Sequence, residues 1–266
     1  MSDHYLTELH EALLRVAGWL PDDVLAHARR LLADERSGDV ARLLVFAGSR
    51  IVLPLNDDDL GVLTELLERE DIDPEVLETI ELAAELPPVL WAFSEEPPDT
   101  GDGCSESEAD GPALTTRLAE NDLVSAVVEE GGVRALWRAW RAPFDAAPYP
   151  LPRPVYVIEV DGGVYRLREH GTGAVDGAKG DEDGEVAEAT EADVVAVDVA
   201  KVAGRLQAKL VAAGERDPQI EVLSPHAPPP PYQRAARVGG KLIWAAEPEI
   251  SIARVFDVVD RRPAPH

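Results

Sequence analysis

The 266-residue sequence predicts an α+β fold, with an N-terminal all-α region, an acidic linker and a small C-terminal mixed α/β domain. Two observations predict this class. Leucine stripes at steps of three and four residues run through residues 1–94, as in amphipathic helices. β-Branched and aromatic runs alternate with a helical stripe in residues 151–266. With 45% hydrophobic residues, the chain has enough apolar side chains to form a core.

Residues 1–94 are predicted to form a helical scaffold. The first helix carries a single apolar stripe, made by Leu6, Leu9, Leu13, Val16 and Leu20. Acid-rich starts at Asp22 and at Asn56 favour further helices, because carboxylates stabilise helix N-termini. Another helix follows the break at Ser37-Gly38, and a fifth is expected from Asp73-Pro74 through Ala84.

A 35-residue offset relates two parts of this region. It aligns Pro21–Leu25 with Asn56–Leu60, and Leu31-Leu32 with Leu66-Leu67. Two helices in about 35 residues is the length of a helical-hairpin repeat. A plain helical bundle gives the same pattern, because any capped helix has an acidic start followed by leucines. We therefore expect either a bundle or a stack of helical hairpins.

Residues 95–112 hold seven acidic and no basic residues, which predicts an acidic flexible linker. Residues 113–150 are predicted to be helical, over Asp122–Val128 and again over Gly132–Arg141. At 100° per residue, the second helix would place a narrow cationic stripe beside an aromatic one. This stripe is a candidate site for an anion or an acidic peptide, formed by Arg134, Trp137, Arg138, Trp140 and Arg141. Alternatively, the tryptophans belong to the core and the arginines to a solvated face.

Residues 151–266 are predicted to form the α/β domain. A hairpin is expected from Val155–Val160 to Val164–Leu167, because Gly162-Gly163 lies between two β-prone runs. The remaining predicted strands are 194–197, Gln219–Leu223 and Ala253–Val259, and the predicted helices have a stripe at Val202 to Val211 and a span from Tyr232 to Ala246. An acidic loop over 171–191 and a Pro-rich strap over 225–231 interrupt these elements.

Few residues predict chemistry. His170 lies at the end of a predicted strand beside the acidic loop, where an acid/base residue could act. Asp181 and Asp183 resemble the middle of a calcium loop, but Lys179 and Thr190 stand where its first and last ligands belong, so a solvated loop is favoured over a metal site. The single cysteine, Cys104, excludes an internal disulfide and a cysteine zinc cage. No cofactor is predicted.

The formal net charge is −26, and residues 1–94 contribute 20 acidic against 7 basic residues. So acidic a chain is not expected to bind nucleic acid or an anionic membrane directly, because phosphate contacts need Lys and Arg. With no long apolar run and no signal peptide, we expect a cytoplasmic protein. The Ala- and Arg-rich, Lys-poor composition indicates a GC-rich bacterial genome.

These observations favour a non-enzymatic cytoplasmic protein-interaction module that binds a partner with a basic surface. It would act as an adaptor, as an inhibitor or immunity-type partner, or as a chaperone-like protein, since an acidic face speeds encounter with a basic partner. The alternative is an enzyme with its site in the C-terminal domain near His170, the loop at 171–177 and the Pro-rich strap. A third hypothesis is an acidic mimic of nucleic acid.

Overall fold

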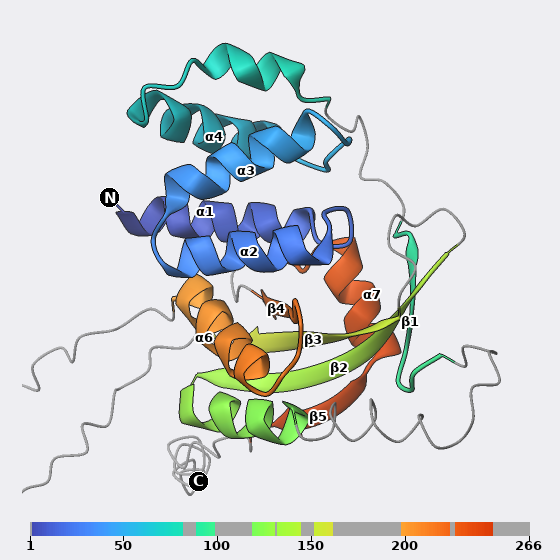
Figure 1. The fold of residues 1–266 in the computed structure, drawn as a ribbon. Coiled ribbons are helices and arrows are strands. Elements are labelled where there is room, and N and C mark those ends of the chain that lie inside the picture. Colours follow the sequence, from blue (N-terminus) through green and yellow to red (C-terminus); the bar gives the residue numbers. More distant parts are fainter. Residues whose placement is uncertain are drawn as a thin grey trace, which may run out of the picture.

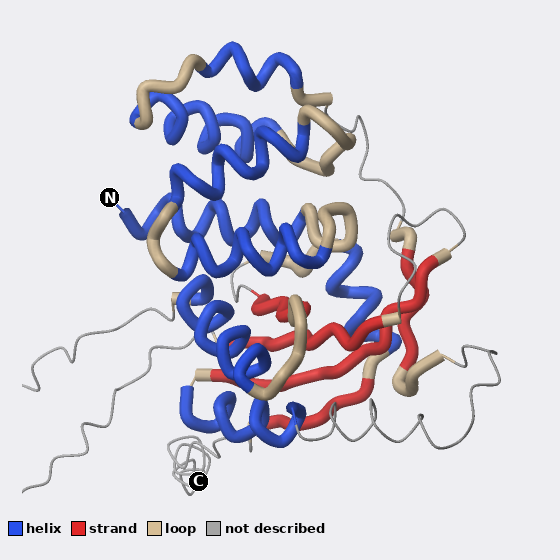
Figure 2. Tube along the Cα trace, viewed as in Figure 1, coloured by secondary structure: helices blue, strands red, loops and turns tan. Residues whose placement is uncertain are grey.

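The computed structural model describes residues 2–81, 89–98, 119–130, 132–144, 152–161, 198–223 and 227–246. These residues form an α+β structure. Four N-terminal helices are stacked in layers above a mixed five-stranded sheet, and helices from later in the chain cover both faces of that sheet (Figures 1 and 2). The predicted fold class is therefore confirmed at this level.

The four N-terminal helices are α1 (Ser2–Arg15), α2 (Asp22–Ala33), α3 (Ser37–Gly48) and α4 (Asp57–Arg69). The predicted acidic start of α4 is a capping box, in which the Asn56 side chain accepts from the Asp59 amide and the Asp59 carboxylate accepts from the Asn56 amide. The leucine stripes of these helices are buried, as the sequence predicts.

The two helical hairpins, α1–α2 and α3–α4, have matching features. Both α1 and α3 begin at a serine, Ser2 and Ser37, and α2 and α4 end at the same kind of turn. There Glu35 (φ 59°) and Asp71 (φ 53°) adopt the left-handed conformation, and the next amide donates back to Leu31 O or Leu67 O, each at 2.9 Å. The 35-residue offset thus relates the starts of these helices, whereas the turns at their ends are 36 residues apart.

The fifth helix was predicted wrongly. Residues Pro74–Thr79 form a short 3₁₀ helix, η1, and the chain becomes extended at Ile80 (φ −83°, ψ 122°). Ile80 is buried in a small cluster with Val45 of α3 and Leu67 of α4. Ile80 thus packs against the α3–α4 hairpin from an extended conformation, where the apolar pattern alone predicted a helix.

The sheet has the strand order β1-β2-β3-β4, and β5 pairs with β2 as well. The strands are β1 (Trp91–Ser94), β2 (Val133–Pro143), β3 (Arg153–Val160), β4 (Gln219–Leu223) and β5 (Lys241–Ala245). Strand β2 is antiparallel to β1, β3 and β5, whereas β3 and β4 are parallel. β1 and β5 share one edge of β2, because β1 pairs with residues 140–143 and β5 with residues 135–138.

Two helix predictions are corrected by this sheet. The segment Gly132–Arg141, predicted as an amphipathic helix, lies mainly in β2, and residues 91–94, grouped with the helical scaffold, form β1. The predicted helix from Tyr232 to Ala246 ends early as α7 (Pro231–Gly239) and is followed by β5. Gly240 forms the bend between them, where a Cβ would lie 2.7 Å from Ala236 O and 2.8 Å from Arg138 O.

Alternate residues of each central strand belong to two different cores. On β3, Val155 and Val157 face α1, α2 and α7, whereas Tyr156 and Ile158 face α6 (Val199–Ala212) and the helix that covers residues 119–130. The first of these cores is continuous between the helical region and the sheet, and the second lies on the opposite face of the sheet. The structure confirms the predictions of β3, α6 and β4, while the strands predicted at 164–167, 194–197 and 253–259 lie outside the described residues.

Alanine substitutions at two helical glycines are expected to change stability in opposite directions. A Cβ on Gly204 of α6 would lie 2.2 Å from the Cβ of Ala33 on α2, whereas a Cβ on Gly61 of α4 meets nothing within 4 Å. We expect Gly204→Ala to destabilise the protein by about 1–3 kcal/mol, because the two helices must separate. Gly61→Ala should stabilise it by up to about 1 kcal/mol. Urea unfolding of both variants measures this, and similar free energies for the two would contradict the close contact of α2 with α6.

Candidate functional site

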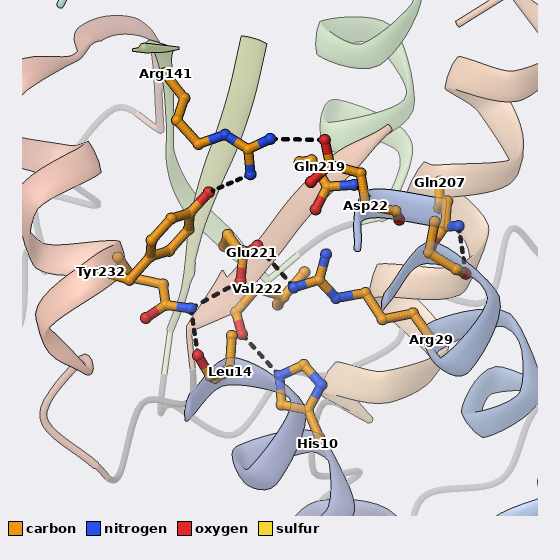
Figure 3. A network of polar contacts seen from close by, with 12 residues as sticks. His10, Leu14, Asp22, Arg29, Arg141, Gln207, Gln219, Glu221, Val222 and Tyr232 are labelled. Atoms are coloured by element: carbon orange, nitrogen blue, oxygen red, sulfur yellow. Dashed lines mark hydrogen bonds and ion pairs between the residues drawn. The ribbon is translucent and has the colours of Figure 1, made fainter. Parts of the chain in front are cut away.

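A network of buried polar side chains lies between the helical layer and the sheet (Figure 3). Two ion pairs form its centre. Arg141 of β2 donates to Asp22 of α2 at 2.6 Å, and Arg29 of α2 pairs with Glu221 of β4 at 2.7 Å. The side chains of Arg141 and Glu221 are 0% exposed. Asp22 and Arg141 are 119 residues apart in the sequence, and this ion pair joins them away from water.

Neutral side chains extend this network to backbone carbonyls. Gln233 of α7 donates through Nε2 to Leu14 O and to the Glu221 carboxylate, each at 2.8 Å. Gln207 of α6 donates to Ala26 O at 2.7 Å, and His10 Nε2 lies 2.8 Å from Val222 O. Burial lowers the pKa of His10 to about 4, so its imidazole is neutral at physiological pH and Nε2 is the donor. Together with the two ion pairs, these contacts connect four helices, α1, α2, α6 and α7, with the strands β2 and β4.

These contacts identify the network as a structural element. Each of its four charged groups is paired with an opposite charge inside the protein, which is what burial of charge requires. No side chain of the network is both ionised and open to a substrate. Its role in the candidate site is to hold the surrounding walls in place.

A cleft of about 270 Å³ lies beside this network, where the helical layer meets the sheet. Its polar members are Glu11 and Arg15 of α1. Its other walls are mostly aromatic or apolar, formed by Trp19, Pro54, Val89, Leu90, Trp91, Ala227, Pro228, Pro230, Pro231 and Tyr232. The Pro-rich strap predicted from the sequence therefore forms part of a cleft wall, next to the start of α7. An apolar cleft with a few polar groups is the usual form of a binding site.

The network fixes the aromatic walls of the cleft. The Arg141 guanidinium stacks over the Trp91 ring at 4.1 Å and donates to the Tyr232 hydroxyl at 3.2 Å. Trp91 Nε1 donates to Gly18 O at 2.9 Å. Gly18 has a φ of +82°, and a Cβ there would lie 2.6 Å from the Tyr232 ring. Trp91 and Tyr232 are consequently held in defined orientations.

A second titratable cluster lies on the opposite face of the sheet. The Tyr156 hydroxyl donates to Glu215 at 3.2 Å, and Arg138 is ion-paired with Glu120. Burial raises the pKa of Glu215 to about 7. The carboxyl groups of Glu215 and Glu120 come from two different segments, and Tyr156 and Arg138 come from neighbouring strands. Within the described residues, no three His, Cys, Asp or Glu side chains are grouped so that they could hold a metal ion.

The predicted cationic stripe does not exist as a single surface. Because β2 is a strand, its alternate residues face opposite ways: Trp137 and Arg141 face the helical layer, whereas Arg138 and Trp140 face the other side. Arg141 is buried and bound to Asp22, Arg138 is bound to Glu120, and Arg134 is exposed. The predicted helix on which this candidate site was based is wrong. Whether these Trp and Arg residues bind an acidic peptide stays a prediction. His170, Asp181 and Asp183 lie outside the described residues.

Sequence reasoning missed the members of the network because they had ordinary local explanations. Asp22 is what a helix start favours, and Gln219 and Glu221 alternate with apolar residues as on a half-solvated strand. In the structure all of β4 is buried. The only available signal was this pair of polar residues in an otherwise apolar strand.

No protein-family model, no curated protein and no solved structure matches the chain. In the described part of the chain, no helix has the length and apolar character needed to cross a membrane.

The first prediction from the site concerns the buried pair of Arg29 and Glu221. Replacing either residue alone, by Arg29→Met or Glu221→Met, should destabilise the protein by about 3–5 kcal/mol, because a buried charge loses its partner. The double variant should recover most of this loss, which urea unfolding of all four proteins measures as a coupling free energy. Removing the exposed pair of Arg42 and Glu70 by Arg42→Met and Glu70→Met is the matched control, and its coupling should be far smaller. Additive single effects at Arg29 and Glu221 would contradict the pairing.

The second prediction concerns the pH dependence of stability through His10. Its pKa is lowered from 6.5 to about 4 by folding, so stability is lost as the pH falls from about 6.5 through 4. We expect the free energy of unfolding of the natural protein to fall by about 2 kcal/mol more between pH 7.5 and pH 5 than that of His10→Gln, whose amide does not titrate. Parallel pH profiles for the two proteins would show that His10 is not buried in its neutral form.

Proposed function

We propose that this chain is a non-enzymatic interaction module that binds a partner protein with a basic surface. The observation that carries the proposal is the acidic surface of α4 and η1, defined as residues 57–81. Ten acidic residues of this surface are exposed, and its single basic residue is Arg69. The exposed acids are Asp57, Asp58, Glu65, Glu68, Glu70, Asp71, Asp73, Glu75, Glu78 and Glu81.

The few contacts of this surface leave most of its charge facing water. Arg69 stacks over the Tyr5 ring at 4.3 Å, and Glu65 accepts from the Tyr5 hydroxyl at 2.6 Å. Among the ion pairs between described residues, only that of Arg42 with Glu70 reaches these ten acids. The contrast with the buried network supports the proposal, because the inner charges are balanced by partners within the protein and the outer ones are not.

An exposed surface of one charge sign speeds and orients encounter with a surface of the opposite sign. The partner is accordingly a protein with clustered Lys and Arg, and binding weakens as salt screens these charges. The module would serve as an adaptor, as an inhibitor or immunity-type partner, or as a chaperone-like protein, in the cytoplasm. A nucleic-acid-binding protein also has a basic face, so the identity of the partner distinguishes simple docking from nucleic-acid mimicry. The enzymatic alternative rests on His170, for which the described residues provide no geometry.

The proposal is tested by capture of partners from the cells that produce the protein, at low and at high salt. We expect one basic protein to bind in stoichiometric amount at low salt and to be released by high salt. The variant with Glu68, Glu75, Glu78 and Glu81 changed to Gln should lose this partner, since four charges are removed from one surface. A matched variant loses the same number of exposed charges elsewhere, through Asp23→Asn, Asp34→Asn, Asp122→Asn and Glu129→Gln, and should keep it.

Capture of no partner at either salt would overturn the proposal. So would a partner that binds the α4–η1 variant as tightly as it binds the natural protein.

A further inference from the structure

We propose that the cleft beside the buried network is an anchor site for the partner, which inserts one aromatic or large aliphatic side chain flanked by basic residues. This inference rests on the proposed function, since it names the part of the partner that is recognised. Three features of the cleft support this inference: its size and chemistry, the rigidity of its walls and the acidic surface close to it.

The volume and lining of the cleft suit one apolar side chain. At about 270 Å³ it lies just below the range for ligand pockets, roughly 300–1,000 Å³, so it is small for a nucleotide or a large cofactor. Its walls include Trp19, Trp91 and Tyr232 together with four prolines. Water bound against such walls is poorly hydrogen-bonded, and its displacement by an apolar group favours binding. Anchors of this kind contribute most of the free energy at many interfaces.

The walls are fixed before a ligand arrives. Trp91 is held by its hydrogen bond to Gly18 O at 2.9 Å and by the stacked guanidinium of Arg141. Tyr232 is held by Arg141 and by edge-to-face contact with the Phe93 ring, with centroids 5.2 Å apart. Little side-chain entropy is therefore lost when an anchor binds, which raises its affinity.

An ion pair connects one wall of the cleft to the start of α4. Arg15, which lines the cleft, donates from Nε to the Asp59 carboxylate at 2.9 Å, so its own charge is balanced. This ion pair places the first turn of α4 next to the cleft. Asp57 and Asp58 belong to the same turn and are exposed. The cleft therefore lies close to the start of the acidic surface, and carboxylates of that surface would select Lys and Arg beside a bound anchor.

The experiment uses the full chain labelled with ¹⁵N and follows the indole N–H resonances of its five tryptophans. The probe is the blocked peptide Lys-Lys-Trp-Lys-Lys, compared with Lys-Lys-Gly-Lys-Lys and Glu-Glu-Trp-Glu-Glu. We expect the first peptide to shift the Trp19 and Trp91 resonances in a saturable way and the glycine peptide to leave them unchanged. The acidic peptide should bind at least about tenfold more weakly at low salt, because its carboxylates are repelled by those of the acidic surface.

Two variants separate the cleft from the rest of the surface. Ala227→Phe fills the mouth of the cleft from an exposed position and should abolish the shifts, whereas Ala212→Phe, exposed on α6, should not. The double variant Asp57→Asn and Asp58→Asn should lower the affinity for the basic Trp peptide about threefold at low salt. Equal shifts with the glycine peptide, or unchanged binding to Ala227→Phe, would overturn the anchor site.

Failure of this inference can be told apart from failure of the proposed function. If a cellular partner is captured equally by the natural protein and by Ala227→Phe, and is released by salt, the acidic surface binds it and the anchor site is wrong. If the Trp peptide binds in the cleft but no partner is captured, the chemistry of the cleft stands and the proposed function is wrong.

Discussion

Two buried ion pairs, Asp22 with Arg141 and Arg29 with Glu221, join the helical layer to the sheet. Removing a charged group from water costs several kcal/mol, and only a well-placed opposite charge offsets that cost. Each pair joins α2 to a different strand, so any sliding of the layer would leave charges buried and alone. Apolar contacts in the shared core stabilise many similar arrangements, whereas these pairs tolerate only one. We infer that they specify the position of the layer more than they add to net stability.

The same contacts connect the interior to the surface that we propose to be functional. Arg141 bonds Asp22, stacks on Trp91 and donates to Tyr232, so the group that anchors the helical layer also shapes the cleft. Arg15 and Asp59 then link the cleft to the first turn of α4. From this turn outward the carboxylates are exposed, and they are available to an external partner. Charges are balanced inside the protein and unbalanced on the acidic surface, which is why we propose that this surface, and not the buried network, binds a partner.

Much of the fold was predictable from local pattern, and the site was not. Helices α1 to α4, α6 and strands β3 and β4 have clear periodicity or caps, and the structure confirms them. Strand β2 was predicted as a helix because its Trp and Arg residues fit a period of 3.6, and because both of its faces are covered it shows no polar alternation. The network could not be predicted, since residues such as His10 and Val222, or Leu14 and Gln233, are more than 200 positions apart. Of the cleft, the sequence indicated only the Pro-rich strap.

Hydrogen exchange of backbone amides at increasing, sub-denaturing urea tests most directly whether the buried pairs make the helical layer and the sheet one cooperative unit. Amides of α2 and of β3 should exchange through the same global opening, with equal free energies and equal dependence on urea. If α1 to α4 instead open at a clearly lower free energy while β2, β3 and β4 remain protected, the layer is an independent unit, and the ion pairs do not control the fold.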